Sequence, residues 1–197
     1  TTFAKNNSKV IELWDGLDEY SYTSSYNVYG VLKVGEPLLL FRIPALQTVE
    51  DPNSPYYGYE VVNNNGIHSV DSSKYKYLGS SQPDFTMGFN TTLRWKDLTF
   101  TAVGDWRHGG LMYSRTANIT GFNGNATFTV YNERDAFVLP NTVKIVNGEY
   151  VENNIPIMAT YWPTAFGSQS QARNREYWVL PKDYFKLREV TLAYTLP

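Results

Sequence analysis

The stretch from Pro83 to Trp106 limits the possible folds of this chain more than any other segment, because it reads as two strands with two different faces. In both strands, which the short turn Lys96-Asp97 joins, large apolar residues alternate with mostly polar or small ones. Side chains alternate between faces along a strand, so this period predicts one apolar and one polar environment. The expected apolar set is Phe85, Met87, Phe89, Thr91, Leu93, Trp95, Leu98, Phe100, Ala102, Gly104 and Trp106.

Two environments fit such a hairpin. A soluble β-sandwich alternates in the same way, apolar toward its core and polar toward water. Each run is also about as long as a tilted strand that crosses a bilayer, roughly 9–11 residues. Trp95 and Trp106 fall at opposite ends, where aromatic rings suit the two membrane interfaces. The polar face is rich in Thr, Asn and Gly, and one short turn contrasts with long connections, so the pattern favours an antiparallel transmembrane β-barrel segment.

Composition narrows the class of protein further. The chain has 197 residues, of which 18% are charged and 16% aromatic. No apolar run approaches the roughly 18 residues of a membrane helix, so a membrane role has to come from strands. The net charge of -2 and the lack of a basic stripe argue against nucleic acid as a partner. The absence of cysteine removes disulfides and Cys-based metal sites.

Outside the hairpin the sequence predicts an all-β chain with nearly no helical periodicity. A first strand is expected from Lys9 to Trp14 and a last one from Tyr184 toward Leu196. The long segments 15–82 and 108–183 are read as irregular extracellular loops that fold into caps over a barrel mouth. Within the second, Asn147-Gly148 predicts a type I′ hairpin turn. We therefore expect residues 1–197 to be part of one barrel domain.

Catalytic and metal-binding signatures are not evident. The sequence shows no nucleophile elbow, phosphate loop or zinc motif, and no cofactor is expected. His68 and His108, the only histidines, are far apart and read as surface or loop residues. Clustered acids at 50–51 and 133–135 leave glycoside hydrolysis by two carboxylates as a weaker alternative, with solvated loop charges favoured. The expectation is a protein that is not an enzyme.

Aromatic clusters in the long loops are the better candidates for binding. Aromatic rings offer flat apolar faces with a polar group, which suits sugar rings or peptide side chains. The alternative is that they pack the loops together or contact a partner protein. The candidate substrate-binding residues are Tyr57, Tyr59, Tyr161 and Trp162.

The order of several segments resembles the C-terminal half of SusC/RagA-type TonB-linked outer-membrane proteins of Bacteroidetes. The hairpin and the closing LREVTLAYTLP are the most specific of them. The other matching pieces are FAKNNSKVIEL, VGEP followed by PYYGYEV, the run from NNNGIHSVDSS into the hairpin, and RDAFVLPNTVKIVNGEYVENN. Together these pieces touch most of the chain in the family's order.

The resemblance implies a large plugged barrel in the bacterial outer membrane that imports oligosaccharides or oligopeptides. A SusD-like surface lipoprotein closes such a barrel, and TonB energises it through regions not in this chain. The chain is expected to be a fragment, because it holds no plug domain, no TonB-contacting segment and no signal peptide. A secreted β-sandwich that binds glycans is the alternative function.

One departure from the family concerns a turn that resembles a calcium loop in many relatives. Here it reads VNNNGIHSVDSS, with Asn63 and Asn65 where acids would be expected. Asp71 is the hard anionic ligand that remains nearby, so no calcium site of EF-hand type is expected.

Overall fold

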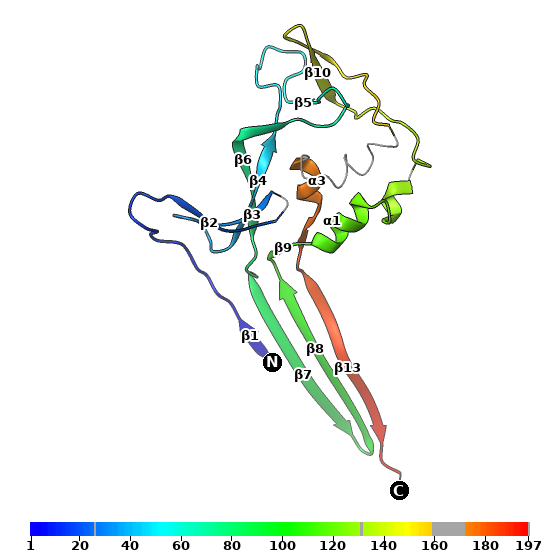
Figure 1. Cartoon of the computed structure of the whole chain (residues 1–197). Helices are drawn as coiled ribbons and strands as arrows, with labels where there is room; N and C mark the ends of the chain where they lie inside the picture. Colours follow the sequence, from blue (N-terminus) through cyan, green and yellow to red (C-terminus); the bar gives the residue numbers. More distant parts are fainter. Residues whose placement is uncertain (26, 131, 159–171, 197) are drawn as a thin grey trace.

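The computed structural model describes residues 1–25, 27–130, 132–158 and 172–196. These residues form four separate sheets and two short helices, and most strand pairs are antiparallel. Figure 1 shows a long, narrow sheet that projects from a broader upper part made of the other elements. Among the described residues, none of the sheets closes on itself. The mostly antiparallel β-structure agrees with the predicted all-β class.

The long sheet contains the predicted hairpin. Strand β7 (Phe85–Trp95) pairs with β8 (Leu98–His108) over its whole length, from Phe85 opposite His108 to Trp95 opposite Leu98. Because paired residues of antiparallel strands lie on the same face, this register places Leu93 beside Phe100 and Met87 beside Trp106. The predicted hairpin and the predicted apolar face are confirmed.

The predicted last strand is also present, and it completes the sheet on the other side of β8. Strand β13 (Tyr184–Tyr194) pairs with β8, with Leu192 opposite Phe100 and Val190 opposite Ala102. The register shifts between Leu187 and Glu189, because Arg188 is an extra residue in a β-bulge. The bulge brings Phe185 and Leu187 onto the same face as Val190 and Leu192.

The predicted first strand, from Lys9 to Trp14, is wrong. The first strand is β1 (Thr2–Ala4), which pairs with residues 86–88 of β7 and so occupies that edge of the sheet. Residues 9–14 have no comparable partner: Lys9 makes one isolated bridge to Pro37, and Trp14 is 85% exposed. A strand needs a neighbour to pair its backbone groups, and a favourable sequence does not supply one.

The segment 15–82 is not irregular, as the sequence predicted, but holds five strands. These are β2 (Glu19–Ser25), β3 (Val28–Lys33), β4 (Leu40–Leu46), β5 (Glu60–Val61) and β6 (Val70–Ser80). Four of them form a sheet in the order β2-β3-β4-β6, and the end of β6 leads directly into β7. Register shifts in the β2–β3 and β4–β6 pairs break the two-residue period, which explains why the sequence pattern did not reveal these strands.

A third sheet lies at the top of the molecule in Figure 1. It joins β5 to the hairpin of β10 (Thr142–Val146) and β11 (Glu149–Glu152). Asn147 and Gly148 have φ values of 51° and 86°, so the predicted type I′ turn is confirmed. Val49, Val61 and Val143 form a buried cluster beside this sheet, and Ile67 with Ile157 form a second one.

Short helices flank a two-stranded continuation of the long sheet. Helix α1 (Arg115–Phe122) begins at Ser114, whose Oγ accepts a hydrogen bond from Ala117 N. A 3₁₀ turn (Thr127–Val130) follows, and α3 (Ala172–Tyr177) leads into β12 (Val179–Pro181). β12 pairs with β9 (Leu111–Tyr113), which follows β8 after Gly109-Gly110. None of the described helices is long and apolar enough to cross a membrane.

The β10–β11 turn gives a test of the upper part. Gly148→Val places a β-branched residue at a left-handed φ, at a cost of roughly 1–2 kcal/mol. The backbone amides of residues 142–152 should therefore exchange about tenfold faster in hydrogen–deuterium exchange of the whole protein. Glu149→Val, at an exposed strand position next to the turn, serves as the control and should leave exchange unchanged. Equal protection in Gly148→Val would show that the turn does not hold this hairpin.

Candidate functional site

The long sheet carries a continuous apolar face that the described residues leave largely uncovered. Its rows run across the strands, for example Leu93, Phe100 and Leu192. Leu93 is 63% exposed and Leu192 is 67% exposed. Burying one large apolar side chain gains roughly 1.5–3 kcal/mol. If several such side chains stayed in water, the burial free energy that is not gained would be comparable to the whole stability of a domain, roughly 5–15 kcal/mol. This face therefore requires an apolar environment.

Aromatic side chains mark both ends of the apolar face. At the upper end, the ring of Phe85 stacks on Phe3 with centroids 5.5 Å apart and meets Trp106 edge-on at 4.9 Å. At the lower end, Trp95 and Tyr194 share the row of Leu98 and are both more than half exposed. The two tryptophans lie at opposite ends, as predicted from the sequence.

The middle of the face is filled by aromatic packing across a glycine. The ring of Phe89 lies over Gly104, where a Cβ would come within 2.4 Å of the ring. Phe89 also stacks with Phe185 at a centroid distance of 5.9 Å. Gly104 thus allows aromatic rings from both neighbouring strands to cover the central strand.

The opposite face of the same sheet is polar. Thr92 and Thr101 lie side by side with their Oγ1 atoms 3.3 Å apart. Higher up, Arg188 forms an ion pair with Asp105, and Lys186 Nζ lies 4.4 Å from the ring centroid of Tyr184. The sheet therefore presents one apolar and one polar face.

The upper part contains a groove of about 580 Å³ between β4, β6 and α3. Its floor is apolar and comes from residues 43–46 of β4. Lys76 and Glu176 form an ion pair at its wall, with Nζ 2.8 Å from Oε1, and Tyr177 is 57% exposed. An apolar floor with a few polar groups is typical of a site for a small ligand or peptide segment.

A cation held between aromatic rings stabilises the sheet that carries this groove. The guanidinium carbon of Arg42 lies 4.0 Å from the ring centroid of Tyr75 and 4.9 Å from that of Tyr29. Arg42 also pairs with Glu19, which accepts a hydrogen bond of 2.5 Å from the Tyr77 hydroxyl. Burial and the Glu19 carboxylate raise the pKa of Tyr77 above its usual value. The hydroxyl therefore stays protonated and keeps donating.

The predicted substrate-binding residues fall into three situations. Tyr59 packs with Tyr56 against the Val49, Val61 and Val143 cluster. Tyr57, two residues earlier, is 59% exposed. Tyr161 and Trp162 lie outside the described residues. Of the two predicted residues that the structure describes, Tyr57 has an exposed ring and Tyr59 contributes to packing.

The candidate metal and catalytic residues are engaged locally. The Asp71 carboxylate accepts hydrogen bonds from Ser73 N and Oγ, which lower its pKa. His68 lies in the connection between β5 and β6, which fits the predicted loop position, but it is buried, with Nδ1 3.1 Å from a Glu60 oxygen. Glu50 pairs with Lys74. Within the described ranges, no group of three or more His, Asp or Glu side chains is placed to hold a metal ion.

Several residues of note were not found from the sequence. Arg175 on α3 is 2% exposed, and burial lowers its pKa to about 10. Its Nε and Nη2 have no hydrogen-bond partner among the described residues. The partners of the Lys76–Glu176 pair are 100 positions apart, so no local pattern reveals them. These contacts depend on the fold and can be seen only in the three-dimensional structure.

Comparison with solved structures relates this geometry to a known fold. The chain is similar to a chain in the structure of the RagAB peptide transporter, with a TM-score of 0.55 and 17% identity, covering 99% of this chain. It is also similar to a chain in the RagAB peptide importer in its closed-closed state, with a TM-score of 0.52 and 17% identity, again over 99% of this chain. In both cases the match covers 20% of the neighbour, so this chain spans about a fifth of its length. The likeness concerns the fold.

Comparisons with protein-family models and with curated proteins found no match.

The two tyrosines give a matched pair of substitutions. Tyr59→Ala should destabilise the segment 47–62 by about 2 kcal/mol, less than for a fully buried ring. Tyr57→Ala removes an exposed ring and should leave stability unchanged. Limited proteolysis of the whole protein, with cleavage within 47–62 followed by mass spectrometry, measures the difference. Equal protease resistance of the two variants would contradict the different roles assigned to these rings.

Proposed function

We propose that this chain is part of an outer-membrane nutrient importer of the SusC/RagA type. The observation that carries the proposal is the two-faced sheet of β7, β8 and β13, whose apolar face the described residues leave exposed. Membrane lipid is the apolar environment that this face requires. The fold likeness to chains of a peptide importer supports the same conclusion.

The dimensions of the strands match this assignment. Each of β7, β8 and β13 has 11 residues, which at about 3.3 Å per residue gives a length of roughly 36 Å. A tilt of about 45° reduces this to a height of roughly 25 Å, the height of the apolar band of outer-membrane barrels. The aromatic residues at both ends fall where such barrels carry their aromatic girdles.

The upper part then lies outside the cell. Figure 1 shows the Lys96-Asp97 turn at one end of the long sheet and all the other sheets at the opposite end. Short periplasmic turns and long extracellular loops are the usual asymmetry of these barrels. In this arrangement the groove between β4, β6 and α3 faces incoming cargo and a SusD-like lipoprotein partner. TonB would act through parts of the transporter outside this chain.

The cargo is an oligopeptide or an oligosaccharide, and the structural neighbours favour the peptide. These neighbours are chains of a peptide importer and a peptide transporter. The secreted β-sandwich alternative would need a second sheet packed on the apolar face. Within the described ranges no sheet covers it, since Phe3, Leu93 and Leu192 are each more than 60% exposed. We propose binding and transport, not catalysis, as the activity.

The face assignment can be tested with two neighbouring substitutions in β8. Phe100→Arg puts a charge on the proposed lipid face near the bilayer centre, at a cost of roughly 2–4 kcal/mol. Thr101→Arg puts the same charge on the polar face and should assemble normally. Heat-modifiable migration of the full-length protein from outer membranes reports the folded fraction. Equal assembly of both variants would contradict the assignment.

The topology can be tested by labelling single cysteines in a chain that has none. A cysteine at Asp97 should resist a membrane-impermeant maleimide added to whole cells, because the turn lies on the periplasmic side. A cysteine at Asn125, which is exposed in the upper part, should react. Both should react after the cells are lysed, which controls for buried thiols. The reverse pattern in whole cells would contradict the topology.

A further inference from the structure

The polar face of the long sheet carries more basic than acidic side chains, although the whole chain has a net charge of -2. The register assigns these residues to the face that contains Thr101. The acidic ones are Asp105 and Glu189. The basic ones on the strands are Arg94, Arg107, Lys186 and Arg188, and Lys182 lies directly above them. The excess of positive charge is therefore concentrated at the upper end of this face.

The two cations in the middle of this face, Lys186 and Arg188, have an acidic neighbour. Arg188 pairs with Asp105, and Lys186 lies beside the same carboxylate across the strand pair. Glu189 accepts a hydrogen bond of 3.0 Å from Thr191 Oγ1. Asp105 and its basic neighbours thus form a local network in which the acid already has its partners.

Arg107 and Lys182, at the upper end, differ from Lys186 and Arg188, because no carboxylate of the described residues forms an ion pair with either of them. Lys182 Nζ donates to Ser81 O and Ser81 Oγ, both at 3.2 Å and both neutral. The Nε of Arg107 is buried and has no hydrogen-bond partner among the described residues. Burial and the nearby charge of Arg107 lower the pKa of Lys182. An anion beside these two groups would offset the repulsion between their charges.

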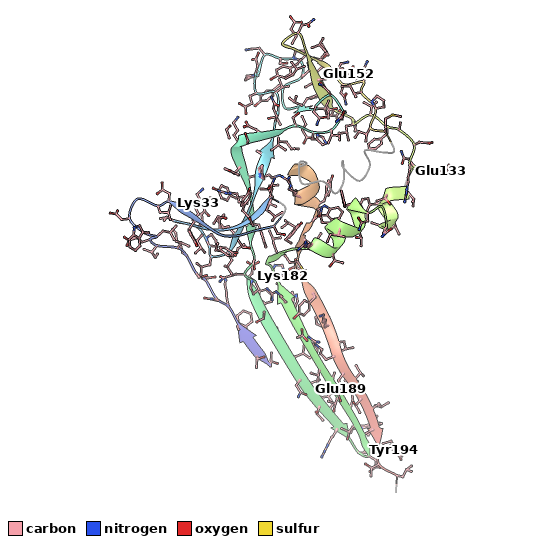
Figure 2. All side chains as sticks on the ribbon, in the orientation of Figure 1. Lys33, Glu133, Glu152, Lys182, Glu189 and Tyr194 are labelled. Carbon is pink, nitrogen blue, oxygen red and sulfur yellow. The ribbon has the colours of Figure 1, made fainter. Side chains whose placement is uncertain are left out.

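The backbone around the pair is held in place. Lys182 N donates to Gly110 O at 2.8 Å, and a Cβ on Gly110 would meet Ser81 O at 2.9 Å. Arg107 is paired with both Thr86 and Tyr184 across the sheet. Figure 2 shows Lys182 at the junction between the long sheet and the upper part. The two cations therefore sit on a rigid support where the polar face opens toward the upper part.

We propose that Arg107 and Lys182 bind carboxylates of acidic peptides and thereby favour acidic cargo. This inference rests on the proposed function, in which the polar face lines the interior of the importer. The register sets Arg107 opposite Tyr184, two residues from Lys182. A guanidinium and an ammonium group on neighbouring strands match the two oxygens of a carboxylate in charge and donor number. The peptide is favoured as the source of that carboxylate because the structural neighbours are peptide importers.

The test uses the full-length transporter with its lipoprotein partner, purified and incubated with a proteolytic digest of casein. Mass spectrometry compares the charge of retained peptides with that of the input. The wild type should enrich acidic over neutral peptides by about tenfold, the effect expected of one hydrogen bond to a charged group. The double variant R107Q/K182Q should lose the enrichment. The charge-preserving exchange R107K/K182R should retain it and shows that the site folds.

A control removes two charges elsewhere: K74Q/K144Q should behave as the wild type does, since these lysines lie on β6 and β10 of the upper part and not on the long sheet. If the wild type retains peptides without a charge preference, or if R107Q/K182Q keeps the preference, this inference is overturned but the proposed import function is not. An equal loss of acidic and neutral peptides in R107Q/K182Q would also overturn it and assign the pair to packing. Oligogalacturonate is a saccharide that carries carboxylates. If the wild type binds it more tightly than acidic peptides, the peptide is not the source of the carboxylate. A wild type that retains no peptide at all would contradict peptide import itself.

Discussion

The pairing of β8 with a strand on each side is the constraint on which the rest of the structure depends. Its register with β7 and β13 decides which side chains share a face, because a shift of one residue would move every side chain of a strand to the other side. Gly104 allows the neighbouring strands to pack aromatic rings over β8 without a clash. The upper part is attached to this sheet through β6, β9 and β12, so the orientation of the sheet also positions the groove.

The bulge at Arg188 connects the two faces of the sheet. Without an extra residue, Phe185 and Leu187 would fall on the opposite side from Val190 and Leu192, and half of β13 would present apolar groups to the polar face. With it, the apolar face is continuous and Arg188 reaches Asp105 on the other side. The single extra residue thus keeps the apolar face continuous and also directs a cation to the polar face. Bulges often redirect a side chain in this way.

The parts that the sequence predicted are those whose stabilising pattern is local and periodic. The β7–β8 hairpin and the Asn147-Gly148 turn can be read from alternation and turn chemistry alone. The same holds for the part of β13 after the bulge at Arg188, but not for the part before it. Strands β2 to β6 are short or interrupted by register shifts, so their period is lost. Tyr57 is a reasonable candidate from sequence, but its distinction from Tyr59 depends on a valine cluster that includes Val143 from a distant segment. The contacts of Lys76 and Lys182, each about 100 positions away, have no sequence signature.

In the long sheet, charged and apolar side chains are separated by face and not by segment. The composition of the whole chain therefore says little about function. Averaged over the chain, acids and bases nearly cancel. On the polar face the bases prevail, and near its upper end burial and the charge of Arg107 lower the pKa of Lys182. Such repulsion is a cost that packing alone does not require, since uncharged side chains could take both positions. The carboxylate of an acidic peptide, as proposed above, would offset this cost, because it brings a negative charge to both cations at once.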